Sequence, residues 1–297
     1  MQKMSPYLDP EVVSRLKTID LKARLVVEGF LTGLHHSPYH GFSVEFAEHR
    51  PYNPGDAIRH IDWRVYGRTG KYYIKEYEEE TNLKAYILLD CSNSMRYQSG
   101  GINKLEYGKT LAAALAWLMI KQRDGVGLGL FHEELAHYIP PKSRFSQLRA
   151  LLQSLEQCEP SHSTGIYPVL SRLAEKIKRR GLIILISDLF DEPAQVMQAL
   201  RNFRYRQHEV LVFHILDPRE RDLDFRQDIE FIDLETEQKL VSQPWLIKKD
   251  YCQKIEELTE YYQTQCHNDQ IDYQLFDTQV PYDQTLLFYL EKRKRLG

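Results

Sequence analysis

The hydrophobic positions of this chain follow two different patterns. Apolar side chains recur at near-helical spacing between residues 10 and 34, at Val13, Leu16, Leu21, Leu25 and Phe30. This spacing predicts a helix. From there to about residue 80 the chain is rich in Tyr, His, Arg and Pro and has only short apolar runs. That stretch is predicted to be made of loops and short strands.

From Leu83 onward, short apolar runs alternate with segments of helical periodicity. The apolar runs predict buried strands over 84–90, 125–131, 182–187 and 209–216, with a last strand at YQLF. Helices are predicted around 111–119, 145–155, 170–177, 196–203, 251–262 and 283–295. Gly181 is the expected cap of the third helix, and residues 229–247 are expected to form a hairpin. Such alternation predicts an α/β fold with a doubly wound, mostly parallel sheet and an N-terminal helical and β-rich extension.

Composition and charge are those of an ordinary globular protein. Of 297 residues, 42% are hydrophobic and 27% charged, and the formal net charge is −3. A nucleic-acid partner is not expected, because such binders usually carry a strongly basic domain. The four cysteines form no CxxC pair, so neither a thiol metal site nor a disulfide framework is expected. No apolar run suits a signal core or a membrane span, so we expect a cytoplasmic protein.

The candidate chemistry lies where two predicted strands end. The first strand ends in Asp90, and Ser92 and Ser94 follow it directly; the strand LIILIS is followed by Asp188. Thr164 lies between these strands, just before a predicted helix. Ligands in open α/β sheets bind beside the carboxyl ends of the strands. Carboxylates and hydroxyls gathered there suit Mg²⁺ or Mn²⁺, although the two serines could instead only cap the following helix.

The sequence DCSNS fits the DxSxS pattern, and this part of the chain resembles the von Willebrand factor A-like domain with its metal-ion-dependent adhesion site. The resemblance implies a Rossmann-like topology. It also implies that Ser92, Ser94 and Thr164 bind the ion directly, that Asp90 and Asp188 act through waters, and that a partner's carboxylate takes an open position. The chain departs from the family pattern at STG around Thr164 and at LFD after Asp188, which leaves Asp191 as a substitute or a helix cap.

A second resemblance is carried by the segment RPYNPGDAIRHIDWRVYGR. It is similar to the signature of the bacterial domain of unknown function 58 family. The matching residues are Arg50, Tyr52, Pro54, Gly55, Asp56, Arg59, Ile61, Asp62, Trp63 and Arg68, with Gly67 in place of the usual alanine. Residues 1–80 are therefore interpreted as an extension that carries the signature, and residues 81–297 as the von Willebrand factor A-like domain.

Members of that family are often encoded beside MoxR-type AAA+ ATPases. The resemblance implies a non-enzymatic, metal-dependent binding module that serves such an ATPase and a client protein in protein assembly or maturation. The alternative is a phosphoryl-transfer enzyme of the haloacid dehalogenase type with Asp90 as its nucleophile. That family usually has a second acid where Ser92 stands, whereas SDLFD could correspond to its later acidic motif.

Overall fold

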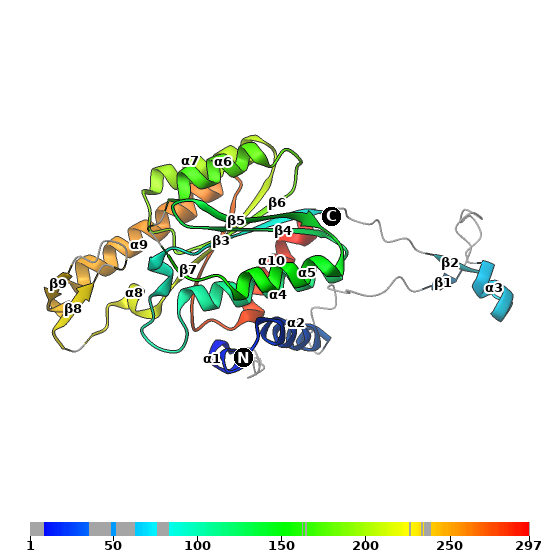
Figure 1. Cartoon of the computed structure of the whole chain (residues 1–297), viewed down its shortest axis with the longest axis horizontal. Coiled ribbons are helices and arrows are strands. Elements are labelled where there is room, and N and C mark those ends of the chain that lie inside the picture. Colours follow the sequence, from blue (N-terminus) through cyan, green and yellow to red (C-terminus); the bar gives the residue numbers. More distant parts are fainter. Residues whose placement is uncertain are drawn as a thin grey trace.

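The computed structural model describes residues 9–35, 49–51, 63–75, 83–161, 163, 165–225, 227–232, 234 and 239–296. A six-stranded sheet with the strand order β10-β7-β6-β3-β4-β5 lies at its centre (Figure 1). Its strands are β3 (Lys84–Asp90), β4 (Gly125–Phe131), β5 (Leu135–Lys142), β6 (Leu182–Ser187), β7 (Glu209–Leu216) and β10 (Asp272–Asp277). Neighbouring strands pair in parallel, except that β5 runs antiparallel to β4. The predicted α/β class with a mostly parallel sheet is confirmed.

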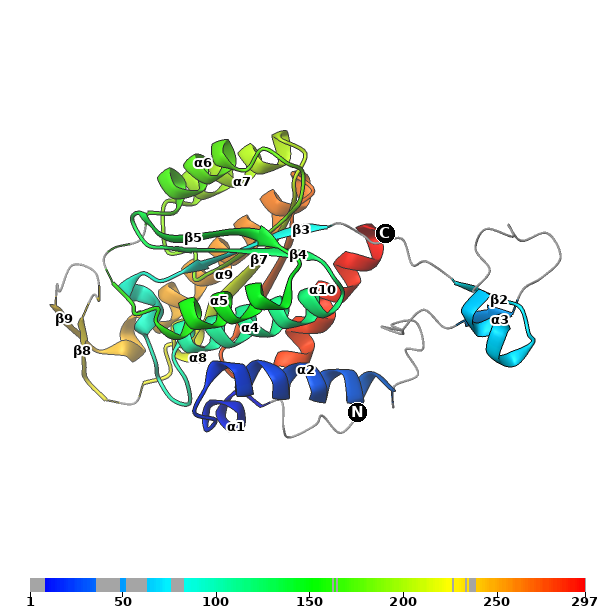
Figure 2. The same cartoon turned by 45° about the vertical axis from the view of Figure 1, so that its right-hand side comes forward.

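Helices cover both faces of this sheet (Figures 1 and 2). On one face lie α4 (Lys104–Lys121), α5 (Phe145–Glu156) and α10 (Tyr282–Leu296); on the other lie α6 (Ile166–Lys176), α7 (Pro193–Tyr205) and α9 (Pro244–Asn268). The sequence of the central strand β6 is apolar throughout because its side chains are buried on both faces of the sheet. Ile184 and Ile186 join the core on the first face, whereas Ile183 and Leu185 join the core on the second.

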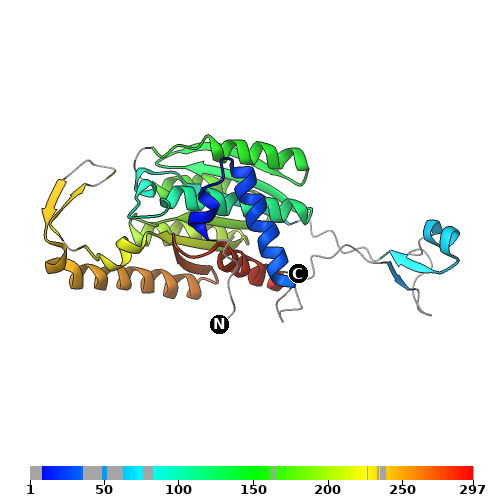
Figure 3. The ribbon, with the colours of Figure 1, turned by 90° about the horizontal axis from the view of Figure 1, so that it is seen from below.

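The first helix α1 (Pro10–Ser14) and the second helix α2 (Ile19–His35) replace the single helix predicted near the start. Val26, Val27 and Phe30 of α2 are buried in the core that includes α4. Figure 3 shows α2 on the outer side of this helical layer. Because α4 is covered by the sheet on one side and by α2 on the other, it is apolar on nearly its whole circumference.

Two local features differ from the sequence expectations. Strand β5 was not predicted, since its exposure pattern is irregular and it contains Pro140 and Pro141. Proline has no N–H to donate, so it is tolerated on an edge strand such as β5. The prediction that Gly181 caps a helix is wrong, because α6 ends at Lys176 and is capped by Ile177.

Smaller elements complete the described chain. At the carboxyl end of the sheet lie the 3-10 turn η3 (Asn93–Arg96) and the short helix α8 (Pro218–Asp222). The predicted hairpin is confirmed as β8 (Ile229–Ile232) and β9 (Lys239–Ser242). Strands β1 (His49–Pro51) and β2 (Tyr73–Lys75) form a separate antiparallel pair that carries α3 (Trp63–Thr69), apart from the six-stranded sheet in Figures 1 and 2.

Gly181 is required for a close approach between chain segments. A Cβ atom at this position would collide with the backbone carbonyl oxygen of Lys84 at the start of β3. We therefore expect Gly181→Ala to lower the free energy of unfolding by at least about 2 kcal/mol, because backbone cannot move aside as a side chain can. Chemical denaturation measures this loss. Gly100→Ala is the control, since its Cβ would meet no atom within 4 Å; equal stability of the two variants would contradict the explanation.

Candidate functional site

Asp90, the last residue of β3, is fully buried at the carboxyl edge of the sheet. Its Oδ1 accepts a hydrogen bond from the backbone N–H of Ser92 at 3.0 Å. Its Oδ2 accepts one from the Ser187 hydroxyl, at the end of the neighbouring strand β6, at 2.6 Å. The carboxylate therefore has a fixed orientation and joins the ends of two parallel strands.

The hydroxyl groups of Ser92 and Ser94 lie together at the entry of η3, with their Oγ atoms 3.0 Å apart. Ser92 occupies the N-cap position of η3, but its side chain makes no capping hydrogen bond. Helix α4 is instead capped by Asn103, whose side chain accepts from the Glu106 N–H at 2.7 Å. The interpretation of the two serines as helix caps is therefore wrong, and their oxygens stay near Asp90.

Asp188 follows β6 and is also fully buried, but it is already paired with a cation. Its Oδ2 accepts from the ammonium group of Lys104 at 2.7 Å. The same ammonium donates to Oε1 of Glu220 in α8 at 2.6 Å. We refer to Asp90, Asp188, Glu220 and Lys104 as the acidic cluster. Two of its carboxylates, those of Asp188 and Glu220, share one fully buried ammonium, and the third, Asp90, lies close enough to Asp188 to be affected by its charge.

The pKa values within the acidic cluster reflect burial first and the neighbouring charges second. Burial, and then the nearby Asp188 carboxylate, raise the pKa of Asp90 to about 7, although hydrogen bonds from Ser187 and Ser92 oppose the shift. Burial also raises the pKa of Glu220 to about 7, against the effect of Lys104. Burial alone would lower the pKa of Lys104, but Asp188 and Glu220 outweigh it and the net shift is upward. Lys104 is thus charged, whereas Asp90 and Glu220 hold protons more readily than ordinary carboxyl groups.

The loop after β6 is held in place by the buried side chains of His214 and Tyr262 and by the half-buried Tyr273, which contacts His214. Burial lowers the pKa of His214 to about 4, so its ring is neutral. In the tautomer that satisfies both contacts, Nε2–H donates to the Asp188 carbonyl at 2.8 Å and Nδ1 accepts from the Tyr273 hydroxyl at 2.6 Å. The Tyr262 hydroxyl donates to the Leu189 carbonyl at 3.1 Å. These bonds fix a loop in which Leu189 has a positive φ of 54°, an unusual conformation for a leucine.

The expected ligand Thr164 lies outside the described residues, but the start of α6 at Ile166 is held by a described neighbour. Asp191 accepts from the Ile166 N–H at 2.9 Å and from the Glu192 N–H at 2.7 Å. Asp191 therefore helps to cap α6 rather than replacing Asp188. This contact brings the start of α6 beside the loop that follows β6.

A third strand end contributes to the site through Asp217, which the sequence analysis missed. Asp217 follows β7 and accepts from the backbone N–H groups of Ser99 at 2.9 Å and Arg219 at 2.8 Å, and from the Ser99 hydroxyl. Its own N–H donates to Glu220 at 2.8 Å, which completes a capping box. The sequence DPRE carries this signal, since an Asp with a Glu three residues later often begins a helix. The capping box directs Glu220 toward Lys104.

These positions give a donor set of hard oxygen atoms. Two carboxylates and two hydroxyls, from Asp90, Asp188, Ser92 and Ser94, suit Mg²⁺ better than a soft metal. Within the part of the chain that the structure describes, no three or more His, Cys, Asp and Glu side chains are grouped to hold a metal ion. A bound cation would therefore depend on hydroxyls and waters as well as on the carboxylates. The burial of like-charged Asp90 and Asp188 fits such a cation.

Most of the signature segment, including Tyr52, Pro54, Gly55, Asp56, Arg59, Ile61 and Asp62, lies outside the described residues. Of the rest, Arg50 pairs with Ile74 across β1 and β2. Trp63 begins α3 with 57% of its side chain exposed and meets Tyr66 edge to face, with 6.1 Å between the ring centroids. Gly67 and Arg68 also lie in α3. These contacts stay within the small β1–β2–α3 unit.

Comparison with known proteins identifies the family of the chain and several relatives. The family model described as "Protein of unknown function DUF58" matches residues 48–257. "Uncharacterized protein Rv1480" of Mycobacterium tuberculosis is 27% identical over 232 residues, which are 77% of this chain and 72% of that protein. "Uncharacterized protein Mb1516" of Mycobacterium bovis matches over the same shares and with the same identity.

Two solved structures are also similar. The conserved hypothetical protein BatB from Bacteroides thetaiotaomicron aligns with a TM-score of 0.47 and 17% identity, over 72% of this chain and 100% of that one. An aerotolerance-related membrane protein from Bacteroides fragilis aligns with a TM-score of 0.45 and 20% identity, over 71% and 99%. Among the described residues of the present chain, no helix has the length and apolar character that crossing a bilayer demands.

The raised pKa of Asp90 predicts how stability depends on pH. Between about pH 4 and 7 the folded protein holds a proton at Asp90 that the unfolded chain has lost, so the free energy of unfolding falls as the pH rises through this window. We expect Asp90→Asn to reduce this slope and to be more stable than the wild type at pH 8 by about 1–3 kcal/mol. Denaturation in a chelator at several pH values measures the effect.

The exposed carboxylate of Asp250 supplies the matched control. Asp250→Asn should leave the pH dependence of the free energy of unfolding unchanged. Part of this dependence should remain in both Asp90→Asn and Asp250→Asn, because the pKa of Glu220 is also raised to about 7. A pH profile of Asp90→Asn that superimposes on the wild type would show that Asp90 titrates normally.

Removal of the shared ammonium should be more damaging than removal of an exposed one. Lys104→Met leaves Asp188 and Glu220 buried without their cation, and we expect a loss of about 3–5 kcal/mol in the free energy of unfolding. Lys121→Met changes an exposed lysine at the other end of α4 and should cost less than about 0.5 kcal/mol. Similar losses in the two variants would exclude Lys104 as the cation on which the cluster depends.

Proposed function

The chain belongs to the DUF58 family, and we propose that it is a cytoplasmic, non-enzymatic protein-binding module whose binding depends on Mg²⁺ or Mn²⁺. In this proposal its site is a von Willebrand factor A-like metal-ion-dependent adhesion site. Ser92, Ser94 and Thr164 would bind the ion directly. Asp90 and Asp188 would hold its coordinated waters.

The charge of the acidic cluster is the observation that supports this proposal most. With every group ionised, its three carboxylates and one ammonium leave two negative charges uncompensated in a buried place. Burial raises the pKa values of Asp90 and Glu220 to about 7, and the Asp188 carboxylate adds to both shifts, as expected beside such an excess of negative charge. A divalent cation beside Asp90 and Asp188 would match it in sign and size, and the hydroxyls of Ser92 and Ser94 lie at the entry to the same place.

The surroundings of this edge favour a protein as the partner. The β8–β9 hairpin and the start of α9 project beyond the end of the sheet where α8 lies (Figures 1 and 2). They expose large apolar side chains, with 48% of Trp245, 70% of Leu246 and 48% of Ile232 accessible. Trp245 and Leu246 are adjacent at the start of α9, and neighbouring exposed apolar side chains are typical of protein–protein contact sites. In our proposal a partner binds here and supplies a carboxylate to the ion.

The partner that we propose is a MoxR-type AAA+ ATPase, which the chain would serve as an adaptor for a client protein during assembly or maturation. This part of the proposal rests on the family alone, because members of that family are often encoded beside MoxR-type ATPases. It requires no catalytic group in the chain itself.

A haloacid dehalogenase-like phosphoryl transfer by Asp90 is the alternative, and the geometry favours it less. A nucleophilic carboxylate needs one oxygen free to attack phosphorus. Both oxygens of Asp90 accept hydrogen bonds, from Ser92 N–H at 3.0 Å and Ser187 Oγ at 2.6 Å, and the residue has no solvent exposure.

The metal proposal predicts stabilisation by the ion. We expect saturating Mg²⁺ or Mn²⁺ to raise the Tm of the reduced full-length protein by about 4–8 °C, because a ligand that binds only the folded state stabilises it. Ser92→Ala combined with Ser94→Ala should abolish the shift. The matched control combines Ser143→Ala with Ser146→Ala, both exposed near the start of α5 at the opposite end of the sheet, and should keep it. Thermal denaturation with and without chelator measures all three proteins.

An equal Mg²⁺ shift in the Ser92→Ala, Ser94→Ala protein would contradict the site. The same two double variants test the partner, since a co-produced MoxR-type ATPase should co-purify with the control variant in Mg²⁺ but not in chelator, and not with the loop variant. Turnover of a phosphomonoester that Asp90→Asn abolishes would establish the enzymatic alternative instead.

A further inference from the structure

Two cysteines far apart in the sequence meet beside the DxSxS loop. Cys91 follows Asp90 at the end of β3, and Cys158 follows the end of α5; their sulfur atoms are 2.7 Å apart. Optimal contact between unbonded carbon atoms occurs at about 3.5–4.0 Å, and sulfur is larger than carbon. A disulfide bond is about 2.05 Å long. The two thiols are thus closer than ordinary packing brings them and need only a small movement to bond.

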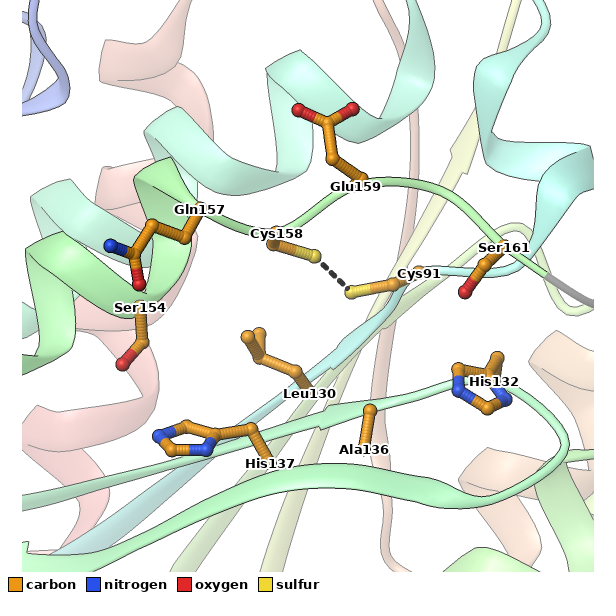
Figure 4. A pocket seen from close by; sticks show the side chains of 10 residues that line it. All are labelled: Cys91, Leu130, His132, Ala136, His137, Ser154, Gln157, Cys158, Glu159 and Ser161. Atoms are coloured by element: carbon orange, nitrogen blue, oxygen red, sulfur yellow. Dashed lines mark hydrogen bonds between the residues drawn. The ribbon is translucent and has the colours of Figure 1, made fainter.

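A small oxidant could reach this pair. Cys91 and Cys158 both line a pocket of about 260 Å³, together with His132, Ser154, Gln157 and Ser161 (Figure 4). Figure 4 shows the two sulfur atoms pointing toward each other at its wall, with Leu130 and Ala136 nearby. Cys158 retains 8% of its surface exposed, whereas Cys91 retains 2%. Cys158 is therefore the better placed of the two to meet a molecule in the pocket.

The pair joins two segments of the site. Ser92 and Ser94 follow Cys91 directly, and the chain after Cys158 leads through residues 159–165 to α6. The backbone already links these segments, since the Ser161 N–H donates to the Cys91 carbonyl at 2.9 Å. A covalent bond between the sulfurs would add to a contact that the fold has made and would need no rearrangement of the sheet.

We propose that Cys91 and Cys158 are a modification site, a thiol pair that hydrogen peroxide oxidises to a reversible disulfide between the end of β3 and the segment after α5. The Cys158 thiolate attacks one peroxide oxygen, so that an S–O bond forms, the O–O bond breaks and hydroxide leaves. Cys91 then attacks the sulfur of the sulfenic acid; the S–S bond forms, the S–O bond breaks, and water leaves. The hydroxide takes up the proton that the Cys158 thiol lost, so the two thiols are oxidised and the hydrogen peroxide is reduced to two molecules of water.

The electrostatic surroundings agree with this assignment of roles. The hydrogen bond with Cys91, and then the positive charge of Lys109, lower the pKa of the Cys158 thiol, although burial opposes them. A lower thiol pKa gives more of the nucleophilic thiolate at neutral pH. Disulfides in reducing compartments are usually transient, so thiol reductants should reverse this one.

The test uses the full chain, reduced with dithiothreitol, desalted, and treated with a small excess of hydrogen peroxide. The count of reactive thiols after unfolding should fall from four to two, and non-reducing proteolysis with mass spectrometry should find one peptide that joins Cys91 to Cys158. Dithiothreitol should restore four thiols. The oxidised protein should melt about 5–10 °C higher, because the bond restricts the unfolded chain.

Matched variants separate this pair from the other cysteines. After the same dose of hydrogen peroxide, the Cys252→Ser and Cys266→Ser proteins should each have one reactive thiol left of three, because Cys91 and Cys158 still bond. The Cys158→Ala protein should form no disulfide. Cys91→Ala should instead trap Cys158 as a sulfenic acid that a dimedone-type reagent labels. If both thiols stay free to alkylation in oxidised wild type, or if another pair is joined, the proposal is wrong. No metal enters the test, so its outcome is separate from that of the metal site.

Discussion

The ammonium group of Lys104 lies without solvent between Asp188 and Glu220, and the carboxyl edge of the sheet is organised around it. A charge taken out of water costs several kcal/mol unless ion pairs and hydrogen bonds replace its hydration. Lys104 has 0% of its side chain exposed, so these two contacts must offset that cost. They also fix three elements relative to one another, because Asp188 follows β6, Lys104 begins α4 and Glu220 belongs to α8. The buried ion pairs therefore form only when β6, α4 and α8 are all in place.

The neighbouring polar groups are placed by the same need for partners. The N–H of Asp217 donates to Glu220, and the carboxylate of Asp217 holds the chain at Ser99. The neutral ring of His214 donates to the carbonyl of Asp188 and accepts from Tyr273. Such a network allows Leu189 to keep a positive φ, since the contacts on both sides determine its backbone. The loops at this edge are therefore held from several strands at once.

The sequence predicts the features that depend on neighbouring residues in the chain, but not the contacts between residues that are far apart in the sequence. Strands such as 182–187 are recognisable because burial on both faces demands apolar residues throughout, and Asp90 and Asp188 are found because they follow such strands. Lys104 is not recognisable, since its partners lie 84 and 116 residues away in the sequence. Cys91 and Cys158 are 67 residues apart and have no motif. β5 was missed because its two prolines are unfavourable in most strands and are tolerated only on an edge strand, a position that the sequence does not show.

Either protons or a divalent cation would neutralise the acidic cluster, and the two would compete for the oxygen atoms of Asp90. Protons on Asp90 and Glu220 remove the excess negative charge when no cation is present, and the pKa values of about 7 place that exchange near neutrality. A divalent ion at Asp90 and Asp188 would need those oxygens ionised, so its binding would release a proton and strengthen as the pH rises. Lys104 sets the balance between the two. By neutralising one carboxylate permanently, it leaves two negative charges for protons or a cation to cancel.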